Sequence, residues 1–119
     1  MKIRLLLAAA ILAGCAGAAS SSAFFGWRVA GVAAGDVLKA RAFPSASSKV
    51  QAAYVNGTNL SLTGTCTGGL DMDQNWFAKL GWTGKRAAVR YRWCQIWHDP
   101  KHNGQFKAGW VYGKFIAPL

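Results

Sequence analysis

Turn-forming residues recur so closely along this chain that only short segments remain between them. The turn signals are AAGD at 33–36, FPSASS at 43–48, VNGT at 55–58, GTCTGG at 64–69, LGWTGK at 80–85, DPKHNG at 99–104 and YGK at 112–114. Short segments between closely spaced turns are typical of an all-β sandwich or barrel. The sequence therefore predicts an all-β fold.

The segments between the turns carry strand patterns. In 58–66, Leu60 and Leu62 alternate with polar residues, which predicts a strand with one buried face. The segment 87–97, AAVRYRWCQIW, has the strongest alternation. One face of this expected strand carries Val89, Tyr91 and Trp93, and the other carries Arg90, Arg92, Cys94 and Ile96. Further strands are expected in 36–43, in 48–55 and, as two short pieces, in 104–116.

One stretch interrupts the strand pattern. In 73–82, Asp73 can cap a helix and Gly81 can end it. Trp76, Phe77 and Leu80 between them are spaced for one helical face. One short helix or turn is predicted here.

The first 23 residues have the composition of an export signal. Lys2 and Arg4 precede an apolar run at 5–13, which is too short for a transmembrane helix of about 20 residues. Two cleavage modes stay open. LAGC resembles the lipobox of bacterial lipoproteins, in which Cys15 becomes the lipidated first residue, whereas SSA at 21–23 allows cleavage before Phe24. The expected location is periplasmic or extracellular, with a membrane anchor only through a lipid on Cys15.

Cysteine usage agrees with export. Once Cys15 is removed or blocked, Cys66 and Cys94 remain as an even pair in an oxidising compartment, so a disulfide between them is expected. Residues 24–119 are enough for one small domain, which gains from a covalent link. The chain-entropy estimate for a loop of this size is about 3–4 kcal/mol.

The domain is basic and rich in aromatic residues. Beyond residue 23, twelve Lys and Arg oppose four Asp and no Glu, a formal net charge of about +8, and all fifteen aromatic residues lie in this part. An anionic partner is therefore expected. Arg suits it because its planar guanidinium bonds carboxylates and phosphates and stacks on rings. The candidate ligand-binding residues are Arg90, Arg92, Trp97, Trp110 and Tyr112.

Three separated pieces resemble bacterial SH3-like domains. GDVLKARAFPSASSKV (35–50) is similar to their opening strand and loop, and VNGTNLSLTGTC (55–66) to their next turn and strand. RWCQI (92–96) and AGWVYGKFI (108–116) resemble the strands that end such domains. The resemblance implies a small SH3-like barrel of about five to six short strands.

Two departures from the family pattern stand out. Phe43 takes the place of a usual Gly, and residues 67–91 form an insertion between the middle strands, bracketed by Cys66 and Cys94. The resemblance implies cell-wall-targeting or peptide-binding activity and no chemistry of its own.

The residues themselves predict no catalysis, metal or cofactor. Asp71, Asp73 and Asn75 have the spacing that begins a calcium loop, but Trp76 replaces the turn Gly. His98, Asp99 and His102 cluster in a turn sequence that predicts a surface hairpin tip rather than a metal site. Neither His belongs to a recognisable nucleophile motif.

The sequence thus predicts a non-catalytic exported binding domain for a cell-envelope ligand, either peptidoglycan or a peptide. The alternative is an interaction protein that docks to another exported protein through the insertion at 67–91. Nucleic-acid binding by a small basic barrel is a weaker alternative, because the export signal argues against it.

Overall fold

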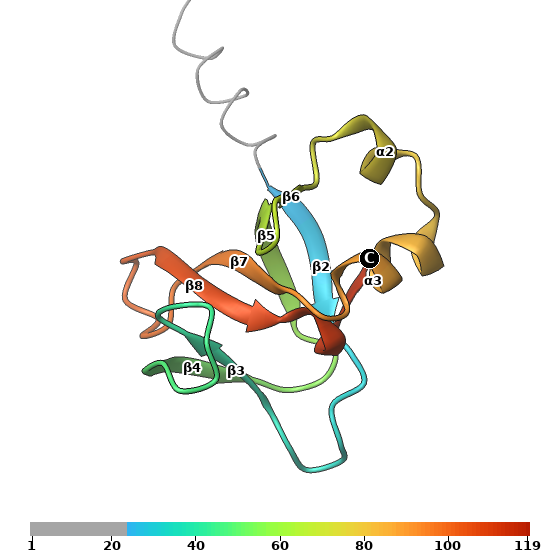
Figure 1. The fold of residues 1–119 in the computed structure, drawn as a ribbon. Helices are drawn as coiled ribbons and strands as arrows, with labels where there is room; N and C mark the ends of the chain where they lie inside the picture. Colours follow the sequence, from blue (N-terminus) through green and yellow to red (C-terminus); the bar gives the residue numbers. More distant parts are fainter. Residues whose placement is uncertain (1–23) are drawn as a thin grey trace, which may run out of the picture.

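Eight strands pair into one antiparallel sheet in the computed structural model, which describes residues 24–119 (Figure 1). They are β2 (Phe25–Val29), β3 (Leu38–Arg41), β4 (Val50–Tyr54), β5 (Asn59–Cys66), β6 (Leu70–Asp71), β7 (Trp93–His98), β8 (Lys107–Tyr112) and β9 (Ile116–Pro118). Their order is β4-β3-β8-β7-β5-β2-β9, with β6 paired to β5. The expected all-β class is confirmed. The export signal, both cleavage sites and Cys15 lie outside the described residues, apart from Phe24.

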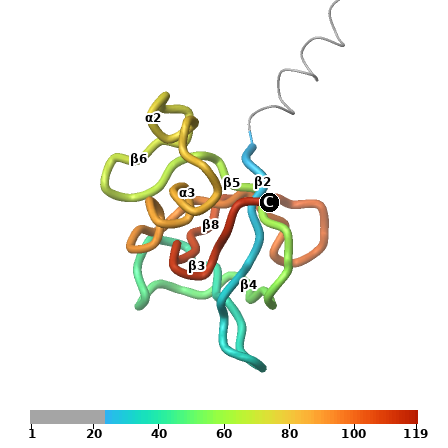
Figure 2. The backbone as a smooth tube through the Cα atoms, turned by 90° about the vertical axis from the view of Figure 1, so that its right-hand side faces the viewer, coloured from blue at the N-terminus to red at the C-terminus, as the bar shows by residue number. Residues whose placement is uncertain are grey.

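Three short helices accompany the sheet within residues 24–119. Two of them, α2 (Asn75–Ala78) and α3 (Trp82–Val89), belong to the insertion and lie to one side of the strands in Figures 1 and 2. The third, the 3-10 helix η1 (Gly113–Phe115), connects β8 to β9. A short helix within 73–82 is confirmed as α2, but its N-cap residue is Gln74 rather than Asp73, and Gly81 precedes α3 instead of ending α2.

β5 shows why alternation in this sequence becomes a strand. Leu60, Leu62 and Cys66 are buried, whereas Ser61 and Thr65 are exposed. Because β5 pairs with β2, β6 and β7, its apolar face must lie toward the core, and a slip of one residue would expose all three buried side chains. The pattern at 58–66 therefore identifies a central strand correctly.

Apolar side chains from several strands and both insertion helices meet in one core. Its members include Trp27, Val29, Leu60, Leu62, Phe77, Val89, Ile96, Val111 and Ile116. At about 25 cal/mol per Å² of buried apolar surface, side chains of this size each contribute about 2 kcal/mol. The core, the eight described strands and the disulfide all lie within residues 24–119, so this part has a folding unit with its own core and covalent link.

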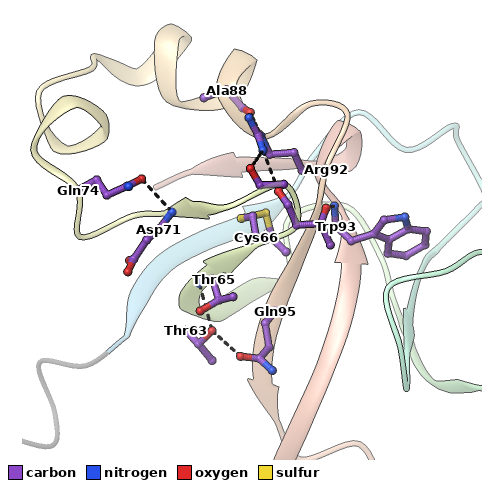
Figure 3. The surroundings of a disulfide bond; sticks show 12 residues. Thr63, Thr65, Cys66, Asp71, Gln74, Ala88, Arg92, Trp93 and Gln95 are labelled. Atoms are coloured by element: carbon purple, nitrogen blue, oxygen red, sulfur yellow. Dashed lines mark hydrogen bonds between the residues drawn. A yellow bond between two sulfur atoms is a disulfide. The ribbon is translucent and has the colours of Figure 1, made fainter.

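The disulfide between Cys66 and Cys94 is confirmed. The two residues are directly opposed on β5 and β7, and both are buried (Figure 3). Next to it, Thr67 N donates to the carbonyl of Trp93 at 2.8 Å, and Trp93 N donates to Thr67 Oγ1 at 2.9 Å. We call the group formed by Cys66, Thr67, Arg92, Trp93 and Cys94 the neck, because the insertion leaves and rejoins the sheet there.

The strand expected over 87–97 is wrong in its first half. Residues up to Val89 continue α3, Arg90 to Arg92 form a turn, and β7 begins only at Trp93. Lys85, Arg86, Ala87 and Ala88 are good helix formers. The helix also buries Val89, whose carbonyl lies against Gly113 of η1. Helix propensity and this tertiary contact outweigh the alternating pattern.

Candidate ligand groove

The outer face of β7 and β8 carries a row of aromatic side chains. Buried residues alternate along both strands, so Trp93, Gln95 and Trp97 share one face of β7, with Ala108, Trp110 and Tyr112 beside them on β8. The register pairs Trp93 with Tyr112 and Gln95 with Trp110. A regular antiparallel register therefore brings aromatic rings from two strands together.

A groove of about 570 Å³ opens at one end of this face. Its aromatic floor is formed by Trp93, Tyr112 and Phe115. The ring centroids of Trp93 and Tyr112 are 5.3 Å apart at 56°, and those of Tyr112 and Phe115 are 6.4 Å apart at 55°. In Figure 3 the indole of Trp93 points away from the disulfide and toward the blue-green segment that contains β3. The floor thus presents tilted, half-buried rings to the groove.

The wall of the groove comes from the segment before β3 and from β3 itself. It contains Val32, Ala33, Asp36, Val37, Leu38, Lys39 and Arg41, with Ala46 from the following loop. Asn56 fastens this segment, because its Oδ1 accepts from Val32 N at 3.0 Å and its Nδ2 donates to the Val32 carbonyl at 2.7 Å. Ala30 N also donates to the carbonyl of Phe115 at 2.9 Å. The wall is tied to the floor.

Positive charge lines one side of the groove. Lys39 is exposed, and Arg41 is half-buried with Nη1 donating to the Ser48 carbonyl at 2.8 Å. The one carboxylate among the lining residues, Asp36, accepts from Val37 N at 2.8 Å through Oδ1. The groove can therefore combine apolar contact with pairing to an acidic group.

The structure brings one of the five predicted ligand residues into the groove. Tyr112 lines it, whereas Trp110 lies on the same face of β8 without lining it. Trp97 borders a different and smaller hollow of about 230 Å³, together with Phe106. The expectation that Arg90 and Arg92 share a strand face with each other is wrong, since both belong to the turn that precedes β7.

Arg92 has a structural position in the neck (Figure 3). Its Nε donates to the Ala88 carbonyl at 3.1 Å, and its Nη1 donates to the carbonyls of Thr67 and Gly68 at 2.8 and 3.1 Å. One guanidinium thus joins the start of the insertion to its end. Arg90 is exposed and donates from Nε to the hydroxyl of Tyr91, which is 76% exposed.

Several groove residues were not predicted from the sequence. The alternation groups Trp93 with Val89 and Tyr91 on one strand face, but Val89 is helical, so the pattern does not indicate that Trp93 lines a groove. Phe115 lines the groove because the 3-10 helix η1 positions it, and the sequence offers no periodic signal for this helix. The loose alternation in 36–43 could have placed Lys39 and Arg41 on one face.

The histidine cluster is divided between the surface and the interior. His102 is exposed and has a φ of 54°, and Asp99 accepts from the backbone N–H groups of Asn103 and Gly104 at 3.1 and 2.8 Å. The Gly104 hydrogen bond, then that of Asn103, lowers the pKa of Asp99. The hairpin tip is confirmed for these two residues. His98 departs from that prediction, because it is 7% exposed at the end of β7.

His98 belongs to a hydrogen-bonded network with β4. Gln51 Nε2 donates to the Ala108 carbonyl at 3.3 Å, so Gln51 Oε1 accepts from His98 Nε2–H at 2.7 Å. His98 Nδ1 then accepts from the Tyr54 hydroxyl at 2.7 Å. Burial, and secondarily Lys107, lowers the pKa of His98. A Cβ at Gly109 would lie 2.7 Å from Nε2, so glycine is needed there.

No protein-family model, curated protein or solved structure matches this chain. In residues 24–119 no three His, Cys, Asp or Glu side chains are grouped as metal ligands would be. No helix of that part has the length and apolar character needed to cross a membrane. The disulfide is typical of a non-reducing compartment.

Proposed function

We propose that this chain is an exported, non-catalytic binding domain of the SH3-like type, and that its groove takes a cell-envelope ligand, either peptidoglycan or a peptide. The observation that carries the proposal is the aromatic floor of Trp93, Tyr112 and Phe115 beside Lys39 and Arg41. Binding sites of this kind are concave and largely apolar, with a few polar groups that fix orientation. The groove has that composition.

Binding is assigned to contact and charge rather than to a reaction. The residues that line the groove include no Ser, Cys or His, and the carboxylate of Asp36 already accepts a hydrogen bond from Val37 N. Aromatic rings supply contact area at a low entropy cost, and the two cations pair with carboxylate or phosphate groups of the ligand. Because exposed charges are screened, the affinity falls as salt rises.

Co-sedimentation with purified peptidoglycan sacculi tests the proposal. The oxidised protein is pelleted at low and at physiological salt, beside the double variant Lys39→Glu/Tyr112→Ala. We expect pelleting that survives physiological salt and an affinity loss of about ten-fold in the variant, which corresponds to about 1.4 kcal/mol.

The matched control is Lys101→Glu/Tyr91→Ala, which makes the same chemical changes at two exposed positions outside the groove. It should pellet like the unchanged protein. No pelleting at either salt would contradict peptidoglycan as the ligand, and equal losses in the two variants would contradict binding through the groove. Thermal midpoints of both variants are measured to separate lost binding from lost fold.

Export is tested by the intact mass of the protein recovered from the producing cell. A diacylglycerol adduct on Cys15 indicates a lipoprotein anchored to the membrane. A chain that begins at Phe24 indicates a soluble exported protein. A mass that retains residues 1–23 unmodified contradicts export by either mode.

A further inference from the structure

The insertion exposes two tryptophans that do not line the groove. Trp76 on α2 is 49% exposed and Trp82 on α3 is 44% exposed. Trp82 is fixed, because its Nε1 donates to the carbonyl of Pro118 at 2.8 Å. A tryptophan with an anchored polar N–H and an exposed apolar surface suits a boundary between water and an apolar phase.

Positive charge is concentrated in the two helices of the insertion and in the turn after them, whereas the exposed carboxylates of Asp71 and Asp73 precede these helices. Residues 74–98 contain Lys79, Lys85, Arg86, Arg90 and Arg92 but no Asp or Glu. Lys85 Nζ lies 6.0 Å from the ring centroid of Phe77, and the guanidinium of Arg86 lies 5.6 Å from that of Trp82. Arg92 is engaged in the neck, and the other four add positive charge around the exposed tryptophans. Cations and aromatic rings thus occupy the same short helices.

This region lies at the end of the molecule where the described chain begins. Figures 1 and 2 both show α2 at the same end as the start of β2, with the segment before β3 at the opposite end. Leu119, which is exposed, is tied to β2 through Leu119 N and the Gly26 carbonyl at 3.3 Å. Phe24 is exposed as well. Leu119 follows Pro118, whose carbonyl accepts from Trp82, so its exposed apolar side chain lies next to the tryptophan surface.

We propose that this end of the molecule docks onto a bilayer that contains anionic phospholipid. Lys79, Lys85, Arg86 and Arg90 would meet the negative headgroups, while Trp76 and Trp82 enter the interfacial layer. The segment 32–37, which forms part of the groove wall, lies toward the opposite end of the molecule from α2 (Figure 1), whereas the groove floor adjoins α3 through η1. The proposal does not depend on the ligand of the groove.

Vesicle flotation tests this docking. Residues 24–119, oxidised, are mixed with vesicles of phosphatidylcholine alone or with added phosphatidylglycerol. This part contains the whole sheet, the core and the disulfide, and its use prevents the apolar run at 5–13 from binding in its place. We expect binding to the anionic vesicles only, weakened by salt.

The decisive comparison is between two double variants that each replace one exposed aromatic residue by Ser and one Lys by Glu. Trp76→Ser/Lys79→Glu alters the insertion, and Phe106→Ser/Lys49→Glu alters exposed residues elsewhere. The first should lose about ten-fold or more in vesicle affinity and the second less than about two-fold. Equal losses would show that net charge alone is responsible and would overturn the proposal.

Two further outcomes also count against it. Equal flotation with neutral vesicles would contradict recognition of anionic headgroups, and no flotation with either vesicle would leave a protein partner as the occupant of this surface. If Trp76→Ser lowers the thermal midpoint, Lys79→Glu/Arg90→Glu is compared with Lys49→Glu/Lys101→Glu. That pair alters charge only, so the comparison no longer depends on the packing of Trp76.

Discussion

The groove and the insertion both place aromatic rings beside cations, but they are built differently. In the groove, Trp93 and Tyr112 are fixed by the register of two paired strands, and their rings are half-buried. In the insertion, Trp76 and Trp82 stand on two short helices that rejoin the sheet at the neck. A sheet thus provides a rigid recess, whereas a fastened loop provides a protruding surface.

The two regions meet at Gly113, and replacing it should have the largest effect. A Cβ there would collide with the carbonyl oxygen of Val89 at the end of α3, while Gly113 N donates to the Arg92 carbonyl at 2.7 Å. Moving the backbone atoms of this packed helix and turn to make room would cost considerable free energy. We expect Gly113→Ala to lower the free energy of unfolding by about 4 kcal/mol or to prevent folding.

Urea denaturation of the variant measures this loss. Gly81→Ala is the control, because a Cβ at Gly81 meets nothing within 4 Å. It should cost less than about 1 kcal/mol. A Gly113→Ala protein as stable as the control would mean that η1 and α3 are not tightly joined.

Removing the disulfide should have the next largest effect and should separate the two regions. Cys66→Ala/Cys94→Ala frees a loop whose ends are 28 residues apart. The expected loss is about 3–4 kcal/mol by the chain-entropy estimate. Amide hydrogen exchange should rise in 67–92 well before it rises in β7 and β8, because the insertion loses its main fastening.

Chemical reduction of the unchanged protein provides a check on the double variant. Both should show the same early exchange in the insertion. Uniform acceleration across the sheet and the insertion would contradict the distinction between a rigid groove and a fastened loop.

The sequence predicts some strands of the sheet correctly but most of the groove not at all. Alternation located β5 because this strand has one buried face and one largely exposed face. The same rule failed at 87–92, where good helix formers and the contact of Val89 with η1 decide the structure. The expected strand face that groups Trp93 with Val89 and Tyr91 therefore does not exist. The groove could be predicted only through Tyr112, since its other parts depend on tertiary contacts.

Replacing Arg92 tests whether this residue stabilises the neck or binds the ligand. Arg92→Met removes three hydrogen bonds to carbonyls from a half-buried guanidinium, so the expected loss of stability is about 2 kcal/mol. Binding through the groove should be unchanged at temperatures where the variant is folded. Arg90→Met is the matched control and should leave the thermal midpoint nearly unchanged. If Arg92→Met lost binding to sacculi without any loss of stability, Arg92 would instead be a ligand-binding residue.

The smallest effect should come from His98, which joins β4 to the strands under the groove. Because burial lowers its pKa, the unfolded chain takes up a proton near the ordinary value of 6.5, whereas the folded protein does so only at lower pH. The unfolded state therefore binds more protons in that window, and stability should fall as pH falls below about 6.5. Below the lowered pKa of His98, this contribution is fully lost.

Thermal midpoints measured from pH 7.5 to pH 4.5 should show this decline in the unchanged protein. His98→Gln should flatten it, because the group that titrates is gone. Asp99 contributes its own acid-dependent loss only near and below its ordinary pKa of 3.8, since hydrogen bonds from Gly104 and Asn103 lower its pKa. Asp99→Asn should therefore leave the decline between pH 6.5 and 4.5 in place. An equally steep decline in His98→Gln would show that other groups control the acid response of the sheet. A buried titratable residue would then not be among the features that distinguish the sheet from the insertion.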